Sequence, residues 1–328
     1  MRPFQYTKAE TAQAALQAQA TQTSYLGGGT NLVDLMKEDV ARPERLIDVS
    51  SLQYDQVSSN ENGGLSLGAM MSNAETANHV DIRKKYPLLS MAMLSAATPQ
   101  IRNMATNGGN LLQRTRCPYF FETSMPCNKR EPGSGCGARN GMNALHAIFG
   151  YSDSCIATHP SDMCVALAAI GAQVEVIGEN GKSRKIDFSD FHRLPGDQPE
   201  KDTVLEAGEL ITAIHLDAPV FADNYYYLKI RERSSYAFAL ISVAAGLQLS
   251  GGTITKAGLA MGGVAHKPWK LREAEKFLQG KAPKLEHFEQ AAEIEMTEAK
   301  PFKDNQYKVE MGKKAIVRAL TQAYERTA

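Results

Sequence analysis

The sequence has few of the features that are typical of nucleic-acid-binding proteins. Lysine and arginine together number 36, as do aspartate and glutamate, so the formal net charge at pH 7 is zero. Such a balance provides no long-range attraction to a polyanion or to an anionic membrane surface. Aromatic residues make up 7% of the chain and do not alternate with basic runs. We therefore expect no nucleic-acid partner.

Long apolar segments are also scarce. The N-terminal stretch MRPFQYTKAETAQAALQ has neither an apolar core nor a small-residue cleavage site, so it does not predict a secretory signal. The uncharged run at 236–255 contains Ser, Gln, Gly and Thr in its second half, which favours a buried strand and a turn over a membrane span. We expect no membrane contact and a cytoplasmic location, unless a partner that carries a signal exports the folded chain.

Cysteine is scarce too, but it is concentrated in one segment. Five cysteines, an odd number, do not suit a disulfide framework in a chain of 328 residues. Four of them, Cys117, Cys127, Cys136 and Cys155, are separated by 10, 9 and 19 positions. No C-x-x-C pair occurs, so the spacing does not indicate a zinc ribbon, a redox dithiol or a ferredoxin-type run.

The segment around these cysteines, residues 113–157, lacks regular periodicity and contains three prolines and five glycines. Long irregular segments within compact domains usually carry function. Its five basic residues outnumber its three acidic ones, which suits a negatively charged thiolate centre. Unrelated thiols, a structural Cys₄ zinc site and an iron–sulfur cluster are the three interpretations. Cys164 stands apart on an apolar helical pattern and is interpreted as a small buried hydrophobe.

Two glycine-rich loops and one helix start form a second set of candidates. In LGGGTNL (26–32), three glycines between a predicted strand and helix permit a tight turn and an anion site at the helix N-terminus. The loop lacks the Gly-Lys-Ser/Thr of a Walker A motif, and Leu32 replaces the third glycine of a Rossmann motif. Alone, it is equally well explained as a turn without a ligand. ATNGGNL (105–111) repeats the paired glycines, and in HPSDMCVALAAIGA (159–172) Asp162 begins a helix, as an N-cap or as a hydroxyl acceptor.

Taken in order, YLGGGTNLVDLM, IRNMATNGGNLLQ and HPSDMCVALAAIGA resemble the FAD-binding subunits of the molybdenum hydroxylases. That family includes xanthine dehydrogenases, carbon monoxide dehydrogenases and aldehyde oxidoreductases. The resemblance extends through YYYLKIRERSSYAFALISVAAGLQL and GGVAHKPWKLREAEKFLQGK, so it covers nearly the whole chain. Within the family, the FAD subunits of bacterial periplasmic aldehyde oxidoreductases are the most similar.

The resemblance implies an α+β fold. It consists of a vanillyl-alcohol-oxidase (PCMH)-type FAD-binding fold of two subdomains, followed by a C-terminal α+β domain like that of carbon monoxide dehydrogenase flavoproteins. We place the FAD-binding domain at 1–220, with subdomains 1–55 and 56–220 and the cysteine-rich insert at 113–157. The C-terminal domain is placed at 224–328, after a boundary near 219–224.

The resemblance also implies residue roles. FAD would lie between the two subdomains, and its pyrophosphate would be wrapped by Leu26, Gly27, Gly28, Gly29, Thr30, Asn31 and Leu32. Thr106, Gly109 and Asn110 would contact the phosphates and the adenosine side, and Asp162 a hydroxyl of FAD. Lys229 would lie near the flavin ring, where the alternative is a solvated strand lysine. No catalytic residue is assigned to the chain.

By the same resemblance, the chain is the electron-transfer subunit of a molybdenum-dependent aldehyde oxidoreductase. A large subunit would carry molybdopterin and a small subunit two [2Fe–2S] clusters, in a heterotrimer that passes electrons through FAD to an external acceptor. Some members carry a [4Fe–4S] cluster in a loop inserted at this position, so Cys117, Cys127, Cys136 and Cys155 are predicted to ligate one. Export to the periplasm with a partner is expected. The alternatives are a self-contained flavin oxidase or reductase, and a non-enzymatic assembly subunit with a Cys₄ zinc site.

Overall fold

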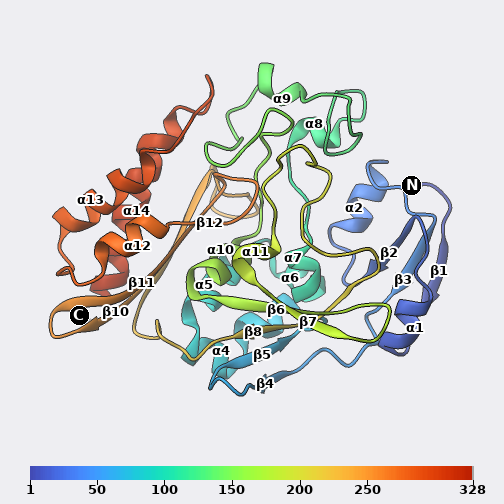
Figure 1. Cartoon of the computed structure of the whole chain (residues 1–328), viewed down its shortest axis with the longest axis horizontal. Coiled ribbons are helices and arrows are strands. Elements are labelled where there is room, and N and C mark those ends of the chain that lie inside the picture. Colours follow the sequence, from blue (N-terminus) through green and yellow to red (C-terminus); the bar gives the residue numbers. More distant parts are fainter. Residues whose placement is uncertain (327–328) are drawn as a thin grey trace.

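The computed structural model describes residues 1–326, which form three successive units (Figure 1). The first unit is a three-stranded parallel sheet of order β1-β3-β2. Its elements are β1 (Gln5–Lys8), α1 (Ala12–Gln17), β2 (Thr23–Leu26), α2 (Leu32–Lys37) and β3 (Arg45–Asp48). Parallel strands need crossover connections, which the two helices supply. The βαβ-like unit expected over the first 50 residues is confirmed.

The second unit is an antiparallel sheet of five strands in the order β4-β5-β8-β6-β7. The strands are β4 (Val57–Ser59), β5 (Leu65–Gly68), β6 (Ala172–Ile177), β7 (Ser183–Asp187) and β8 (Leu210–Leu216). The helices of this unit are α3 (Asn73–Asn78), α4 (Val80–Lys85), α5 (Pro87–Ser95), α6 (Pro99–Met104), α7 (Asn107–Leu111), α10 (Asp162–Ile170) and α11 (Phe188–Phe191).

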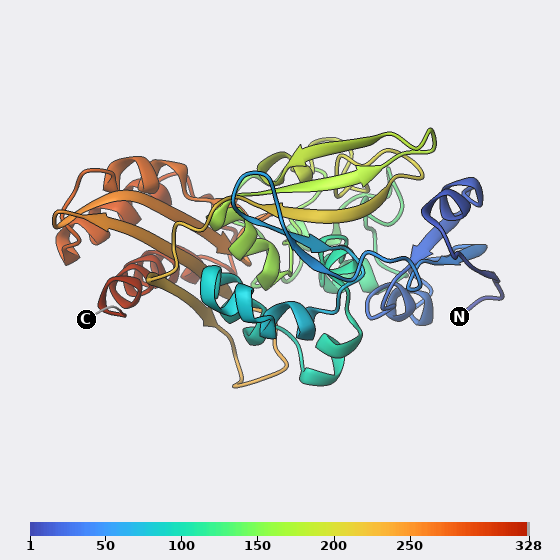
Figure 2. The same ribbon diagram turned by 90° about the horizontal axis from the view of Figure 1, so that it is seen from below.

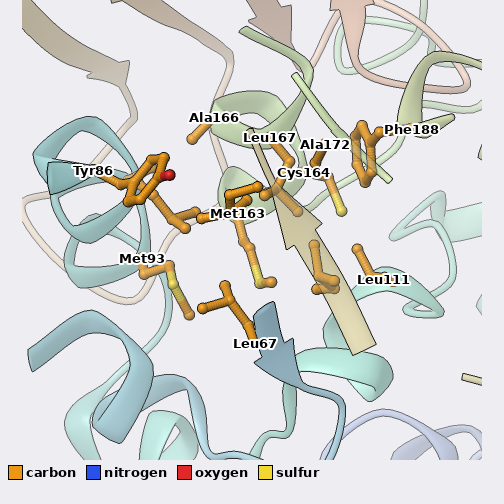
Figure 3. Close-up of a cluster of buried hydrophobic side chains, with 14 of the residues drawn as sticks. Leu67, Tyr86, Met93, Leu111, Met163, Cys164, Ala166, Leu167, Ala172 and Phe188 are labelled. Atoms are coloured by element: carbon orange, nitrogen blue, oxygen red, sulfur yellow. The ribbon is translucent and has the colours of Figure 1, made fainter. Parts of the chain in front are cut away.

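Helix α10 lies at the centre of the molecule. It packs against α5 and against the C-terminal strands β10 and β11, so it is buried on every side. A helix that is apolar all round is stable only in such a position. Figure 3 shows Met163 and Cys164 of this helix among Leu67, Met93 and Leu111, which come from a strand and from two other helices. Cys164 is 0% exposed, as a small buried hydrophobe should be.

The third unit is an antiparallel sheet of order β12-β11-β10-β9, covered on one face by three helices. Its elements are β9 (Asn224–Ile230), β10 (Ile241–Ser250), β11 (Thr253–Gly262), β12 (Trp269–Lys270), α12 (Arg272–Leu278), α13 (Leu285–Met296) and α14 (Tyr307–Glu325). The uncharged run 236–255 supplies β10 and a turn at Gly251 and Gly252, where φ is positive, so the predicted buried strand and turn are confirmed. No helix in residues 1–326 is long and apolar enough to span a membrane. Figure 2 shows the first and third units at opposite ends, with the second between them.

The cysteine-rich insert contains little regular structure, as expected. Its helices, α8 (Pro118–Phe121) and α9 (Gly137–Asn140), have four residues each. The insert is tied to a distant segment at Asp202, where Arg114 Nε lies 2.7 Å from Oδ2 and Lys129 Nζ contacts Oδ1. Burial opposes ionisation of Asp202, but Lys129 and Arg114 outweigh it and lower the pKa of the carboxyl well below its usual value. The order of this loop therefore depends on charged contacts outside it.

Candidate functional site

A cavity of about 830 Å³ lies where the three units meet. The first unit contributes Thr30 and Asn31, the second contributes Asp162, and the third contributes Lys229 and Gly262. Its volume is in the range of small-molecule and cofactor sites, roughly 300–1,000 Å³. The cavity therefore joins segments that the sequence analysis had connected only by resemblance.

The first glycine loop packs directly on the second glycine motif. A Cβ on Gly28 would lie 1.7 Å from the carbonyl oxygen of Met104, and a Cβ on Gly27 would lie 2.9 Å from Thr106 Oγ1. Gly29 has φ +71°, in the left-handed region that favours glycine. Gly28 is therefore required by the approach of another backbone segment and Gly27 by the approach of the Thr106 side chain, a role that the sequence analysis had not considered.

This packing decides which predicted residues face the cavity. Thr30, Asn31, Gly109, Asn110, Asp162 and Lys229 line it. The predicted residues outside its lining are Leu26, Gly27, Gly28, Gly29, Leu32 and Thr106. Thr106 is 7% exposed, and its hydroxyl accepts a hydrogen bond from Gly109 N at 3.1 Å as the N-cap of α7. Its side chain is thus used within the protein.

The side-chain amide of Asn31 has no hydrogen-bond acceptor among residues 1–326. Its Oδ1 accepts a hydrogen bond from Arg114 N at 2.9 Å, while its buried Nδ2 has no partner. Buried amides without a partner are rare in folded proteins, because each costs desolvation energy. A bound anion such as phosphate would satisfy this donor, so the loop fits the phosphate-binding role assigned to it.

Asn110 joins the second motif to the third. Its Nδ2 donates to Asn73 Oδ1 at 2.6 Å, and its Oδ1 accepts from Ser161 Oγ at 2.6 Å. Ser161 is also the N-cap of α10, because its Oγ accepts from Cys164 N at 3.0 Å. The helix cap is therefore Ser161, and the alternative in which Asp162 merely caps the helix is wrong.

Asp162 instead forms a buried ion pair with Lys229. Asp162 Oδ2 lies 2.8 Å from Lys229 Nζ, and each side chain is 5% exposed. Lys229 Nζ also donates to Ser95 O at 3.1 Å, and Tyr227 OH donates to Asp162 Oδ1 at 2.6 Å. The alternative of a solvated strand lysine is wrong, since this cation is buried at the cavity wall.

Tyr227 was missed by the sequence analysis. It lies two residues before Lys229 on β9, and side chains two apart on a strand share a face, which was the available signal. Burial and the neighbouring Asp162 raise the pKa of Tyr227 well above its usual value. Its hydroxyl therefore remains a donor to the carboxylate.

Several cavity residues, most of them in irregular segments, were also missed. Arg116, Asn73 and the loop residues Arg233, Tyr236 and Phe238 all line the cavity. The guanidinium of Arg116 lies 5.2 Å from the ring centroid of Phe238, so the cysteine insert and the β9–β10 loop meet here. The motif RERSSYAF contained the signal for the loop, but nothing in the sequence places Arg116 beside it.

A second, small cavity is lined by all four clustered cysteines. Cys127 and Cys136 are brought opposite each other by an antiparallel bridge. All five cysteines are free in the described part of the chain. Burial raises the pKa of Cys117 to about 12 and that of Cys155 to about 11. Without a bound cation these groups would remain thiols, which argues against a reactive dithiol.

The basic residues of the insert serve mainly to fold it. Arg130 donates to the carbonyl oxygens of Tyr119 and Phe120 at 2.8 and 2.9 Å, and Arg139 pairs with Asp153 at 2.9 Å. Of the five, Lys129 lines the cysteine cavity. The expected surplus of positive charge is present, but most of it stabilises the loop rather than facing the sulfurs.

Four thiolates suit either a tetrahedral zinc or an iron–sulfur cluster, so the ligand count of this cavity fits both kinds of centre. Within residues 1–326, a group outside the cavity, His159, Cys164 and His192, also has ligand atoms within 4.8 Å of one another.

One wall is shared by the two cavities. Cys117 lines both, and His146 lines the large one. His146 Nε2 lies 3.2 Å from Cys117 Sγ. Burial and, to a lesser extent, Lys308 lower the pKa of His146 to about 4, so this imidazole is neutral at pH 7.

A dinucleotide-sized cavity held between two glycine motifs fits a flavoprotein, and comparison with known proteins identifies the class. The model of the FAD binding domain in molybdopterin dehydrogenase matches residues 2–219, and that of the CO dehydrogenase flavoprotein C-terminal domain matches residues 226–327. The chain belongs to the FAD-binding subunits of the molybdenum hydroxylases, a family of oxidoreductases. The resemblance and the fold class inferred from the sequence are therefore confirmed.

Individual relatives agree with this assignment. The chain is 44% identical over 325 residues to the aldehyde oxidoreductase FAD-binding subunit PaoB of Escherichia coli, covering 98% of this chain and 99% of the relative. It is 27% identical to the carbon monoxide dehydrogenase medium chain of Afipia carboxidovorans, covering 92% and 88%. The solved carbon monoxide dehydrogenase of Hydrogenophaga pseudoflava has the same fold, with a TM-score of 0.76 at 24% identity and coverage of 100% and 99%.

Proposed function

We propose that the chain is the FAD-carrying electron-transfer subunit of a molybdenum-dependent aldehyde oxidoreductase. The observation that carries this proposal is the cavity between the glycine motifs, with its free Asn31 amide and its buried lysine. The similarity to an aldehyde oxidoreductase FAD-binding subunit points to the aldehyde class. Electrons would arrive from iron–sulfur centres and leave to an external acceptor.

The residues present fit FAD. Thr30 and Asn31 would bind the pyrophosphate, Gly109 and Asn110 the adenosine side, and Asp162 a hydroxyl through its remaining lone pairs. Lys229 would lie by the flavin, where a cation stabilises the negative charge of the reduced ring. When bound, flavin supplies a centre that accepts electrons singly and releases them in pairs.

We further propose that Cys117, Cys127, Cys136 and Cys155 ligate a [4Fe–4S] cluster. Their convergence on one cavity supports this proposal. The test is iron and acid-labile sulfide per chain, with electron paramagnetic resonance of the reduced protein. About four of each per chain are expected. Each of the four Cys→Ser variants should lose or degrade the cluster, because metal binding orders such loops.

Cys164→Ala is the control, since this cysteine is fully buried but lies in the hydrophobic core, outside the cysteine cavity. It should leave the iron content unchanged. Zinc in place of iron in the wild-type chain would support the assembly-subunit alternative and refute the proposed [4Fe–4S] cluster. Iron lost on changing Cys164 would show that the ligand set is wrong.

The partners proposed are a molybdopterin-binding large subunit and a [2Fe–2S] small subunit, in a heterotrimer with one copy of each. The presence of multi-subunit carbon monoxide dehydrogenases among the relatives supports this arrangement. Export to the periplasm together with a signal-bearing partner is part of the proposal. Native mass spectrometry of the co-expressed complex, with cell fractionation with and without the partners, tests it. A lone chain that oxidises aldehydes at the full rate would instead identify a self-contained flavin oxidase.

A further inference from the structure

The shared wall of the two cavities contains a side-chain hydrogen bond to one of the four clustered sulfurs. His146 Nε2 lies 3.2 Å from Cys117 Sγ, and His146 is 3% exposed. Other N–H contacts to these sulfurs come from the backbone: Ala157 N lies 3.4 Å from Cys155 Sγ, and the amides of Tyr119 and Phe120 hydrogen-bond Cys117. His146 is thus a side-chain donor at the cysteine cavity that a substitution can remove.

The third unit of the fold fixes the position of His146. Its carbonyl oxygen accepts hydrogen bonds from Asn305 Nδ2 at 3.1 Å and from Lys308 Nζ at 3.0 Å, and both donors belong to residues that are 0% exposed. Lys308 Nζ also donates to Gly263 O at 2.7 Å, and Gly263 lines the large cavity. The backbone of His146 is therefore held from outside the insert, so the place of its ring beside Cys117 does not depend on the insert alone.

The chemistry of a ligating cysteine fixes the direction of the bond. A thiolate bound to iron can only accept hydrogen bonds, so Nε2 must carry the hydrogen and donate it. Hydrogen bonds to ligand sulfurs raise the reduction potential of iron–sulfur clusters, because reduction adds negative charge that the donor stabilises. The bond is on Cys117, the cysteine whose residue also lines the flavin cavity.

We propose that His146 is a positioning residue that raises the reduction potential of the cluster through the Nε2–H···Sγ bond to Cys117, and so sets the relative ease of reducing the cluster and the flavin. This inference rests on the proposed cluster. It assigns a role to a histidine that no motif singled out, at the wall that the cysteine cavity shares with the large cavity.

The experiment compares His146→Leu with His146→Gln in the purified, iron-loaded chain. Both variants should keep the wild-type iron content. A redox titration followed by electron paramagnetic resonance should show that, at a fixed ambient potential, the ratio of reduced to oxidised cluster falls about tenfold in His146→Leu, equivalent to about 59 mV for one electron. In His146→Gln the amide nitrogen can donate from a similar position, so most of the shift should be recovered.

Tyr119→Phe is the control for packing changes. The Tyr119 ring lies 6.3 Å from that of His146 and lines the cysteine cavity, but its hydroxyl accepts a hydrogen bond from Met142 N at 2.8 Å rather than contacting a sulfur. The cluster potential should therefore stay at the wild-type value in this variant.

Several outcomes would overturn the inference. They are an unchanged potential in His146→Leu, equal shifts in the leucine and glutamine variants, and a shift of the same size in Tyr119→Phe. If His146→Leu fails to retain iron, His146→Asn, whose shorter side chain does not reach the sulfur, takes its place in the comparison. Loss of iron from all three His146 variants would mean a purely structural role. A wild-type chain without iron would instead refute the proposed cluster, which the iron analysis reveals before any titration.

Discussion

Replacing Lys229 with methionine should destabilise the chain by about 3 kcal/mol, because it leaves the Asp162 carboxylate buried without its cation. The two charged atoms lie 2.8 Å apart, and both side chains are 5% exposed. At an effective dielectric constant of about 20, their attraction is about 6 kcal/mol, and desolvation cancels part of it. Breaking a buried ion pair by removing one partner costs about 3–5 kcal/mol.

The remaining contact of Asp162 places the expected loss at the lower end of that range. Tyr227 OH still donates to Asp162 Oδ1 at 2.6 Å, and a hydrogen bond to a charged group contributes about 1.5–3 kcal/mol. The measurement is denaturant-induced unfolding of the flavin-free chain at pH 7, followed by circular dichroism. A loss below about 1 kcal/mol would refute the buried ion pair.

A double variant separates loss of the pair from loss of packing. In Asp162→Leu/Lys229→Met both charges are replaced by apolar groups, and such replacements are often close to neutral. We expect the double variant to be more stable than Lys229→Met alone. If the stability lost in the double variant instead equals the sum of the losses in Asp162→Leu and Lys229→Met, the two side chains do not interact as the geometry indicates.

The same substitution has a functional consequence in the loaded chain. Lys229 lines the cavity proposed for FAD, so its removal takes away positive charge near the reduced flavin. The flavin midpoint potential of Lys229→Met should become more negative than that of the wild type, as measured by spectroelectrochemical titration. A potential that does not move would place Lys229 away from the ring.

Two further predictions concern the glycine loop and a buried lysine. Gly28→Ala should cost about 1–3 kcal/mol and lower FAD occupancy, because the new Cβ would meet Met104 O at 1.7 Å; Gly178→Ala, whose Cβ would have no neighbour nearer than 3.8 Å, should do neither. Burial lowers the pKa of Lys308 from 10.5 to about 7, so between these values the unfolded chain binds the extra proton and stability rises with pH. From pH 7 to pH 9, the free energy of unfolding of the wild type should therefore rise by about 2–3 kcal/mol relative to that of Lys308→Met. If the difference between the two proteins does not change with pH, Lys308 titrates normally.

Local sequence patterns were enough to predict the elements that carry the site. Glycines between a strand and a helix favour a tight turn, so LGGGTNL could be identified as a loop without the structure. The expectation of a second loop at ATNGGNL was wrong, because Gly108 and Gly109 lie in α7, whose N-cap is Thr106. Four cysteines in one short, irregular segment predicted a shared centre because few other roles explain such a concentration. These inferences depend on residues close together in the chain.

What only the tertiary structure decided is which atoms of these elements face one another. Three contacts join residues that are far apart in the chain. They are the close approach of Met104 to Gly28, the ion pair of Lys229 with Asp162 and the hydrogen bond from His146 to Cys117. Such contacts depend on how three separate sheets pack around α10, and side-chain direction cannot be deduced from spacing across independent units. The sequence by itself determined the first glycine loop, the concentration of cysteines and the family, whereas packing decided which side chains line the large cavity and brought the four cysteines to one pocket.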